Sequence, residues 1–122
     1  MPEPYSCPVE LTVDIIGGKW RTVLLSHLKE GVQRYGDLRR LVPAISEKML
    51  SQRLRELTAA GLVTRRDLGA NPPHVEYELT PEGRSLAPVL QAMYDWGVAR
   101  SDRAAAGGRG QWSRDADGGQ AE

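Results

Sequence analysis

The period of the apolar residues along this chain changes at one point, next to Gly61. Before that glycine, apolar side chains recur every three or four residues, which is typical of helices that pack on a core. After it, Val75, Tyr77 and Leu79 alternate with polar residues, which indicates a half-buried strand. A length of 122 residues suffices for one core, so we expect one small, mainly helical domain with a β-hairpin.

Turn and capping residues divide the part before Gly61 into four expected helices. Pro8 suits the first position of a helix that Gly17 ends, and a second helix runs from about Trp20, expected in the core, to Glu30. The third helix spans residues 35–42, and its apolar side consists of Leu38, Leu41 and Val42. A serine caps the fourth helix, whose apolar stripe consists of Met49, Leu50, Leu54 and Leu57.

The β-hairpin is expected to pair residues 62–68 with the strand that ends at Leu79, across a turn-rich loop over residues 69–74. Thr80 and Pro81 then begin a last helix, which reaches about Arg100. The residues that follow are rich in Gly, Ala and Asp, which predicts a disordered tail. We therefore expect an N-terminal arm over residues 1–7, a folded domain over residues 8–100 and a tail over residues 101–122.

The basic residues are concentrated in one part of the chain, although the net charge of the whole chain is zero. Residues 34–66 contain eight basic and three acidic residues, a net charge of +5, whereas the rest of the chain carries a net charge of −5. A molecule polarised in this way suits a polyanionic partner such as a nucleic acid.

Four polar residues lie opposite the apolar stripe of the fourth helix, because successive residues are about 100° apart on a helix. They are Lys48, Ser51, Gln52 and Arg55. Lysine and arginine bind guanine edges or phosphates, glutamine pairs with adenine, and serine donates or accepts, so this face suits the major groove of DNA. The same pattern allows an ordinary solvated helix face as the alternative.

The order of the expected elements is that of a winged helix-turn-helix. It consists of a short helix, a turn, a longer helix with a basic outer face, and a hairpin with two arginines. The chain resembles the HxlR family, winged-helix transcriptional regulators related to the MarR group, from Cys7 to about Arg100. The stretches that carry the resemblance are Cys7-Pro8-Val9, Ile16-Gly17-Gly18-Lys19-Trp20, ISEKMLSQRLREL from Ile45 to Leu57, Gly61-Leu62-Val63 and Tyr77-Glu78-Leu79-Thr80-Pro81-Glu82-Gly83.

The resemblance implies that Ser46–Ala60 is the recognition helix and that residues 62–79 form the wing. Together with the polar outer face of the fourth helix, the resemblance implies a set of residues that contact double-stranded operator DNA. These are Arg34, Arg39, Ser46, Lys48, Ser51, Gln52, Arg55, Arg65 and Arg66. Two residues depart from the family pattern. Ala44 stands in the turn where glycine is more usual, and Pro88 is expected to bend the last helix by removing a hydrogen bond.

The resemblance also implies a homodimer whose contact uses the terminal helices. On the last helix, an apolar stripe available for this contact consists of Leu86, Val89, Leu90, Met93 and Trp96. A twofold partner would cover such a stripe symmetrically. Burial of the stripe in the core of a single monomer is the alternative.

Cys7 is the single cysteine, which excludes an internal disulfide framework and fits a cytoplasmic protein. At the start of the first helix its sulfur is expected beside unsatisfied N–H groups and the positive end of the helix dipole, where the thiolate is favoured. In the HxlR family a cysteine at this place often senses quinones, aldehydes, hypochlorite or disulfide stress, so the resemblance implies a redox sensor. A small, inert, buried thiol is the alternative.

No other group of residues predicts chemistry. Neither His27 nor His74 has cysteine or acidic residues at metal-ligand spacing, and no catalytic arrangement or phosphate-binding loop stands out, so we expect no metal, cofactor or enzymatic activity. No segment predicts a membrane span or a signal peptide. The leading hypothesis is a sequence-specific transcriptional regulator with an inducer of unspecified chemistry. The alternatives are a winged-helix module that binds proteins or small molecules but not DNA, and a cysteine-dependent reductase or peroxidase.

Overall fold

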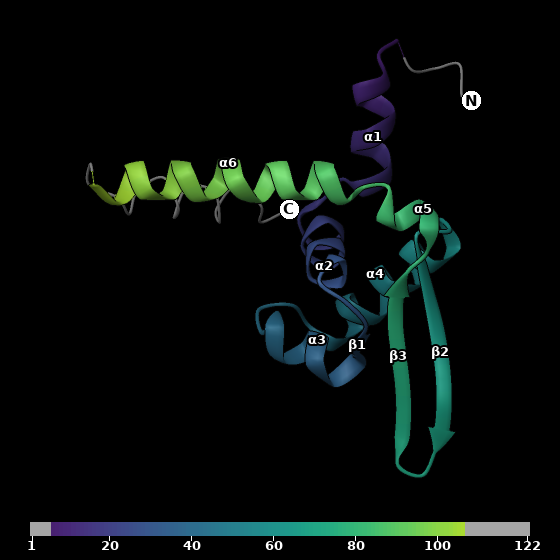
Figure 1. The fold of residues 1–122 in the computed structure, drawn as a ribbon. Helices are drawn as coiled ribbons and strands as arrows, with labels where there is room; N and C mark the ends of the chain where they lie inside the picture. The colour runs from purple at the N-terminus through teal and green to yellow at the C-terminus, as the bar shows by residue number, and fades with distance from the viewer. Residues whose placement is uncertain (1–5, 107–122) are drawn as a thin grey trace. The chain divides into compact units, whose positions relative to one another are not determined.

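The computed structural model of the protein describes residues 6–106 and divides the chain into two compact units, residues 1–87 and residues 88–122. The elements of the first unit, in chain order, are α1 (Pro8–Ile16), α2 (Lys19–Lys29), β1 (Gln33–Arg34), α3 (Tyr35–Leu41), α4 (Glu47–Ala59), β2 (Val63–Ala70), β3 (Pro73–Leu79) and α5 (Pro81–Arg84). The helix α6 (Ala87–Ala106) follows (Figure 1). The expected fold class, mainly helical with a small β-hairpin, is confirmed.

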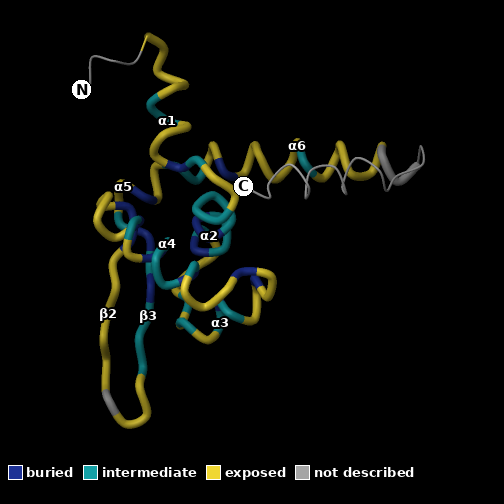
Figure 2. Tube along the Cα trace, turned by 180° about the vertical axis from the view of Figure 1, so that it is seen from behind, coloured by how far each residue is buried: buried dark blue, intermediate teal, exposed yellow. Residues whose placement is uncertain are grey.

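The core of the first unit lies between α2, α3, α4 and the end of the sheet that adjoins them. Figure 2 shows the buried segments on these elements, whereas β2 and the tip of the hairpin are exposed along almost their whole length. The leucines with no more than 2% exposure in this unit are Leu24, Leu25, Leu28, Leu38, Leu50, Leu54 and Leu57. Leu38, Leu50, Leu54 and Leu57 were expected on the apolar sides of their helices. Full burial of such side chains stabilises the fold by roughly 1.5–3 kcal/mol per residue.

In each of α2, α3 and α4, one apolar residue lies nearer the surface than the sequence predicts. Trp20 is half-buried because it lies in the first turn of α2, where Lys19 Nζ is 4.6 Å from the centroid of its ring. Met49 is likewise half-buried in the first turn of α4. Leu41 is 46% exposed, because α3 ends there and the next residue, Val42, leaves the helix and takes the buried position.

The change of period at Gly61 corresponds to a change of element in the structure. Gly61 has a φ of 80°, a left-handed conformation that glycine adopts without the steric cost of a side chain. The turn allows the Leu62 N–H to donate to the Leu57 carbonyl at 3.1 Å. As a result, the chain leaves α4 and enters β2 within four residues of Ala59.

The sheet has three antiparallel strands in the order β1-β3-β2. Strand β1 was not expected, because two residues are too few to show a period. The hairpin is longer than predicted: β2 and β3 pair as far as Ala70 and Pro73, so Gly69 and His74 belong to strands rather than to a loop. Only the two residues between Ala70 and Pro73 make the turn, and the arginines of β2 are held in a regular register.

The expected single last helix is wrong, because the chain forms two helices there. The Thr80 hydroxyl caps α5 by accepting from the Gly83 N–H at 3.0 Å, as expected, but α5 ends at Arg84. Pro88 therefore lies in the first turn of α6, where it removes no helical hydrogen bond, rather than bending a continuous helix.

The last helix also continues further than predicted, to Ala106 instead of about Arg100. The remainder of the predicted tail, residues 107–122, and residues 1–5 of the predicted arm lie outside the described residues. Across residues 6–106, none of the helices combines the length and the apolar character that crossing a membrane requires.

Candidate nucleic-acid interface

The helix α4 is fixed at its start by a cap and along one side by the core. The Ser46 hydroxyl accepts from the Met49 N–H at 3.0 Å, and Glu47 places a negative charge in the first turn, where the helix dipole favours it. Ser46 thus has a structural role in addition to its predicted contact with DNA. Because Leu50, Leu54 and Leu57 are buried, the opposite face of α4 is turned away from the core.

The four residues predicted to share this outer face do so, but their side chains differ in freedom. Lys48 and Arg55 are exposed, whereas Ser51 and Gln52 are half-buried. The Ser51 hydroxyl lies 3.3 Å from the hydroxyl of Tyr35, and the Gln52 amide donates to Glu56 at 3.4 Å. The outer face therefore combines two free cations with two polar side chains that their neighbours hold in place.

A hollow of about 650 Å³ lies beside this face, between α3, α4 and the hairpin. It brings together three of the predicted DNA-binding residues from separate elements, namely Arg34 of β1, Ser51 of α4 and Arg65 of β2. Tyr35 and Arg40 also line it and were not predicted as site residues. Of the described side chains that line the hollow, three are arginines and one is acidic, so its net charge is positive.

The acidic residue of the hollow, Asp37, is held ionised. Its carboxylate accepts from the backbone N–H of Arg34 at 3.0 Å and from Arg40 Nη2 at 2.5 Å. The backbone hydrogen bond is the largest cause, and it lowers the pKa of Asp37 below its ordinary value. Burial opposes this lowering, and the hydrogen bond and charge of Arg40 add to it. Asp37 thereby orients Arg40 and fixes the junction between β1 and α3.

The two arginines of the wing lie on opposite faces of the sheet, because neighbouring residues of a strand point in opposite directions. Arg65 pairs with Tyr77 in the register and lines the hollow, with Asp67 Oδ2 4.0 Å from its Nη2. Arg66 instead forms a close ion pair with Glu78. The sequence placed both arginines on one DNA-facing wing, and only Arg65 reaches the hollow.

Arg39 is also less free than its predicted outward position suggests. Its side chain is 40% exposed, yet Nη1 is buried without a hydrogen-bond partner among the described residues. Glu47 Oε2, at the start of α4, is 3.9 Å from this nitrogen. Arg39 therefore lies between α3 and the beginning of the predicted recognition helix.

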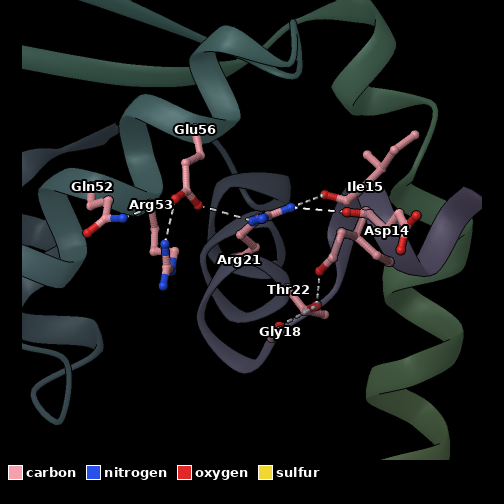
Figure 3. A network of polar contacts seen from close by, with 9 residues as sticks. Asp14, Ile15, Gly18, Arg21, Thr22, Gln52, Arg53 and Glu56 are labelled. Carbon is pink, nitrogen blue, oxygen red and sulfur yellow. Dashed lines mark hydrogen bonds and ion pairs between the residues drawn. The ribbon is translucent and has the colours of Figure 1, made fainter. Parts of the chain in front are cut away.

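A polar network that the sequence did not reveal joins α4 to α1 and α2 (Figure 3). Arg21 of α2 donates from Nε to Glu56 at 3.2 Å and from Nη1 to the carbonyls of Asp14 and Ile15 at 3.1 and 3.0 Å. Glu56 also accepts from Arg53 Nη1 at 2.6 Å. Burial raises the pKa of Glu56, but the hydrogen bond and charge of Arg53, together with Arg21, outweigh it and lower the pKa below its ordinary value.

Cys7 is the N-cap residue of α1, as predicted, and it is exposed rather than buried. No capping hydrogen bond to its side chain occurs within the described chain. The neighbouring Ser6 donates from its backbone N–H to Glu10 Oε1 at 2.8 Å, which closes the first turn of the helix. The position of Cys7 thus leaves its sulfur accessible to solvent.

The two histidines make no metal site with their neighbours. His74 Nε2 lies 2.9 Å from Glu76 Oε2 on β3, and His27 is half-buried on α2. Between Ser6 and Ala106, no three side chains of His, Cys, Asp or Glu are grouped so that they could hold a metal ion.

The second unit, taken by itself, presents much of the predicted apolar stripe on its surface. Met93 is 47% exposed and Trp96 is 65% exposed, and Val89 is exposed as well, whereas Leu90 is buried. Leu86, which precedes α6, is half-buried. Exposed apolar side chains of this size on one helix are typical of a surface that contacts another protein.

Comparison with known proteins assigns this architecture to a family. The model of the HxlR-like helix-turn-helix family matches residues 15–105. The chain belongs to the HxlR-like helix-turn-helix family. Two relatives from Bacillus subtilis (strain 168) are the HTH-type transcriptional regulators YdeP and YybR. YdeP is 50% identical over 97 residues, 80% of this chain and 76% of YdeP, and YybR is 45% identical over 101 residues, 83% of this chain and 81% of YybR.

Solved structures agree with this HxlR assignment. The redox regulator HypR in its reduced form superposes with a TM-score of 0.75 at 43% identity, over 82% of this chain and 99% of HypR. The reduced form of the transcriptional regulator YodB from B. subtilis gives a TM-score of 0.62 at 36% identity, over 75% of this chain and 91% of YodB. This chain is therefore a winged-helix member of a family of DNA-binding transcriptional regulators, which are not enzymes. Its α4 corresponds in order to the predicted recognition helix, and β2 and β3 correspond to the wing.

Proposed function

We propose that the protein regulates transcription as a homodimer that binds an inverted-repeat operator with one α4 helix in each of two successive major grooves. The observation that carries the proposal is the arrangement of the first unit. The outer face of α4 lies beside a positively charged hollow to which β1, α3 and β2 each contribute an arginine. A major groove accepts a helix, and the phosphates on either side of it require cations at its flanks.

The residues divide into two groups by what they would contact. Lys48, Gln52 and Arg55 on the outer face of α4 suit base edges, together with the hydroxyl of Ser51. Arg34 and Arg65 in the hollow suit the DNA backbone, and Arg39, Ser46 and Arg66 would contact the DNA backbone outside the hollow. A protein-binding module would instead present an apolar or aromatic face on α4, and that of this chain is polar.

The proposed dimer contact is the apolar stripe that includes Val89, Met93 and Trp96. These side chains are exposed on α6, and a twofold partner would bury them symmetrically. Dimers of this kind read two half-sites that are one helical turn of DNA apart, about 34–36 Å, or a multiple of it.

Cys7 is the proposed point of regulation. It is exposed at the start of α1. Two proteins similar to this chain in fold and sequence support the proposal: HypR is a redox regulator, and the structure of the transcriptional regulator YodB has been solved after diamide treatment. Since the described chain offers no second cysteine, a disulfide at Cys7 would join two protomers or take up a small thiol. Such a bond would act on DNA affinity through the position of α1 rather than at the DNA surface.

Selection of DNA fragments by the purified protein tests this function. We expect enrichment of an inverted repeat, a footprint over two half-sites, and a dimer in sedimentation measurements at the same concentration. A monomer that protects one half-site would contradict the dimer. Failure to enrich any sequence, at low as well as moderate salt, would contradict DNA recognition and favour a module that binds another partner.

A further inference from the structure

The side chain of Gln52 has a fixed neighbour one helical turn further along α4. Its Nε2 donates to Glu56 Oε2 at 3.4 Å, and the same carboxylate oxygen accepts from Arg53 Nη1 at 2.6 Å. Gln52 is half-buried, in contrast to the exposed Lys48 and Arg55 of the same face. Among these three predicted base contacts, Gln52 is thus the one that the protein itself orients.

The chemistry of this contact determines which way the Gln52 amide faces. A carboxylate only accepts hydrogen bonds, so the group that faces Glu56 is the NH₂ and the carbonyl oxygen is turned away. One N–H and the carbonyl oxygen of Gln52 then remain for a partner. This donor and acceptor pair is complementary to the N7 and N6 groups of adenine in the major groove.

Glu56 is itself held from the far side by Arg21. The guanidinium of Arg21 spans from Glu56 Oε1 to two carbonyls in the last turn of α1, those of Asp14 and Ile15 (Figure 3). Arg21 and Glu56 are only 31% and 32% exposed, so solvent competes with this contact less than at a free surface. The orientation of Gln52 therefore depends on a chain of contacts that crosses from α4 through α2 to the end of α1.

We propose that Glu56 and Arg21 are positioning residues for base recognition: together they fix the amide of Gln52 for an adenine edge and make that readout depend on the end of α1. The proposal rests on the proposed function, because it requires α4 to lie in the major groove. It adds two specificity-determining residues that do not themselves contact DNA.

The experiment measures base discrimination rather than affinity alone. The dissociation constants of the parent protein are compared for its selected operator and for a set of operators with one substituted base pair each. The base pair at which Gln52→Ala lowers discrimination is the one that Gln52 reads. At that base pair, we expect Glu56→Ala and Glu56→Gln to lower discrimination by about three- to tenfold, which is the cost of leaving one side chain unordered.

Three matched variants separate positioning from charge and folding. Glu30→Ala removes an ion-paired carboxylate at the C-cap of α2 with the same change in charge, and it should leave discrimination at every base pair unchanged. Glu56→Gln keeps the size of the side chain, and its folding is checked by circular dichroism. Arg21→Ala should reproduce the loss seen with Glu56→Ala, and the double variant should lose no more than either single one.

The outcomes are distinct. The proposal would be overturned by a folded Glu56→Gln protein that discriminates as well as the parent at the base pair that Gln52 reads. DNA binding by α4 would not be affected by that result. The same holds if Glu56→Ala lowers discrimination further in a Gln52→Ala background, or if Glu30→Ala has an equal effect. If Gln52→Ala changes no base preference, Glu56 has no reading side chain to position and the proposal is wrong. Absence of DNA binding by the parent protein would instead refute the proposed function itself.

Discussion

The ionisation of Glu56 links the stability of the first unit to pH. Its pKa lies below the ordinary value of 4.5, so the ionised side chain stabilises the fold above that pH, and this stabilisation is lost as the pH falls through the folded-state pKa. We expect Glu56→Gln to lower the free energy of unfolding by about 1 kcal/mol near pH 7. The difference from the parent should shrink below pH 4.5, which urea denaturation at several pH values would measure. An equal difference at all pH values would show that the charge of Glu56 plays no part.

Cys7 provides a second test at the scale of one residue. If its modification controls DNA binding, diamide or a quinone should weaken or strengthen operator binding by the parent protein and leave Cys7→Ser unaffected. Shifting the dimer from about 99% to 1% in the DNA-binding conformation requires that the non-binding conformation be stabilised by roughly 5.5 kcal/mol relative to the binding one, which a covalent bond can supply. Operator binding would be followed by fluorescence anisotropy, with dithiothreitol as the reversing control. An equal response of the serine variant would point to a non-covalent effector.

The sequence predicted the local roles of single residues better than it predicted which distant residues contact each other. Ser46 and Thr80 were recognised as caps because a cap depends on neighbours within one turn. The ion pair of Arg21 with Glu56 joins residues 35 positions apart, and no local pattern signals which arginine meets which carboxylate. Likewise, the exposure of Leu41 follows from the exact end of α3, which apolar spacing does not specify.

At the scale of elements, the two faces of the wing should contribute differently to DNA affinity. Arg65 lines the hollow, and we expect Arg65→Ala to weaken binding to all sequences alike and to lower the salt dependence by about one unit per lost phosphate contact. Arg66 is paired with Glu78 on the other face, so Arg66→Ala should have a smaller effect.

Titrations at several salt concentrations would measure both slopes. Glu78→Gln is the matched control, because it releases Arg66 and should raise affinity for every sequence. If Arg66→Ala has the larger effect on the slope, the DNA backbone passes along the opposite face of the wing. A loss at one base pair only would contradict a backbone contact for either arginine.

The elements that the sequence predicted best are helices of several turns and strands in which apolar and polar residues alternate. The helix α4 has a cap, a buried stripe and a glycine at its end, and its expected and observed bounds agree within one or two residues. The two-residue strand β1 has no period to detect. The break between α5 and α6 was missed because residues 80–85 contain no large apolar side chain, so no helical period marks where α5 ends.

For the whole molecule, the central expectation is that α6 holds two protomers together. Trp96→Glu places a charge in the proposed contact, where it would lack a partner, so we expect dissociation to monomers at micromolar concentration and loss of the two-half-site footprint. Sedimentation equilibrium would measure this. Gln91→Lys adds a charge beside Asp95 on the opposite side of α6 and should leave the dimer intact. A Trp96→Glu protein that stays dimeric would place the contact elsewhere.

The division of the chain after Ala87 separates the proposed DNA recognition from the proposed pairing, so the two properties can diverge independently among such regulators. Every residue proposed to touch DNA precedes the division, and the stripe proposed for pairing lies almost entirely beyond it. After a gene duplication, substitutions in residues 88–106 could therefore separate the two copies into distinct homodimers while both still bind the ancestral operator. A chimera that carries this segment from a relative should keep the base preference of the parent and exchange its pairing partner, which co-purification of differently tagged chains would reveal.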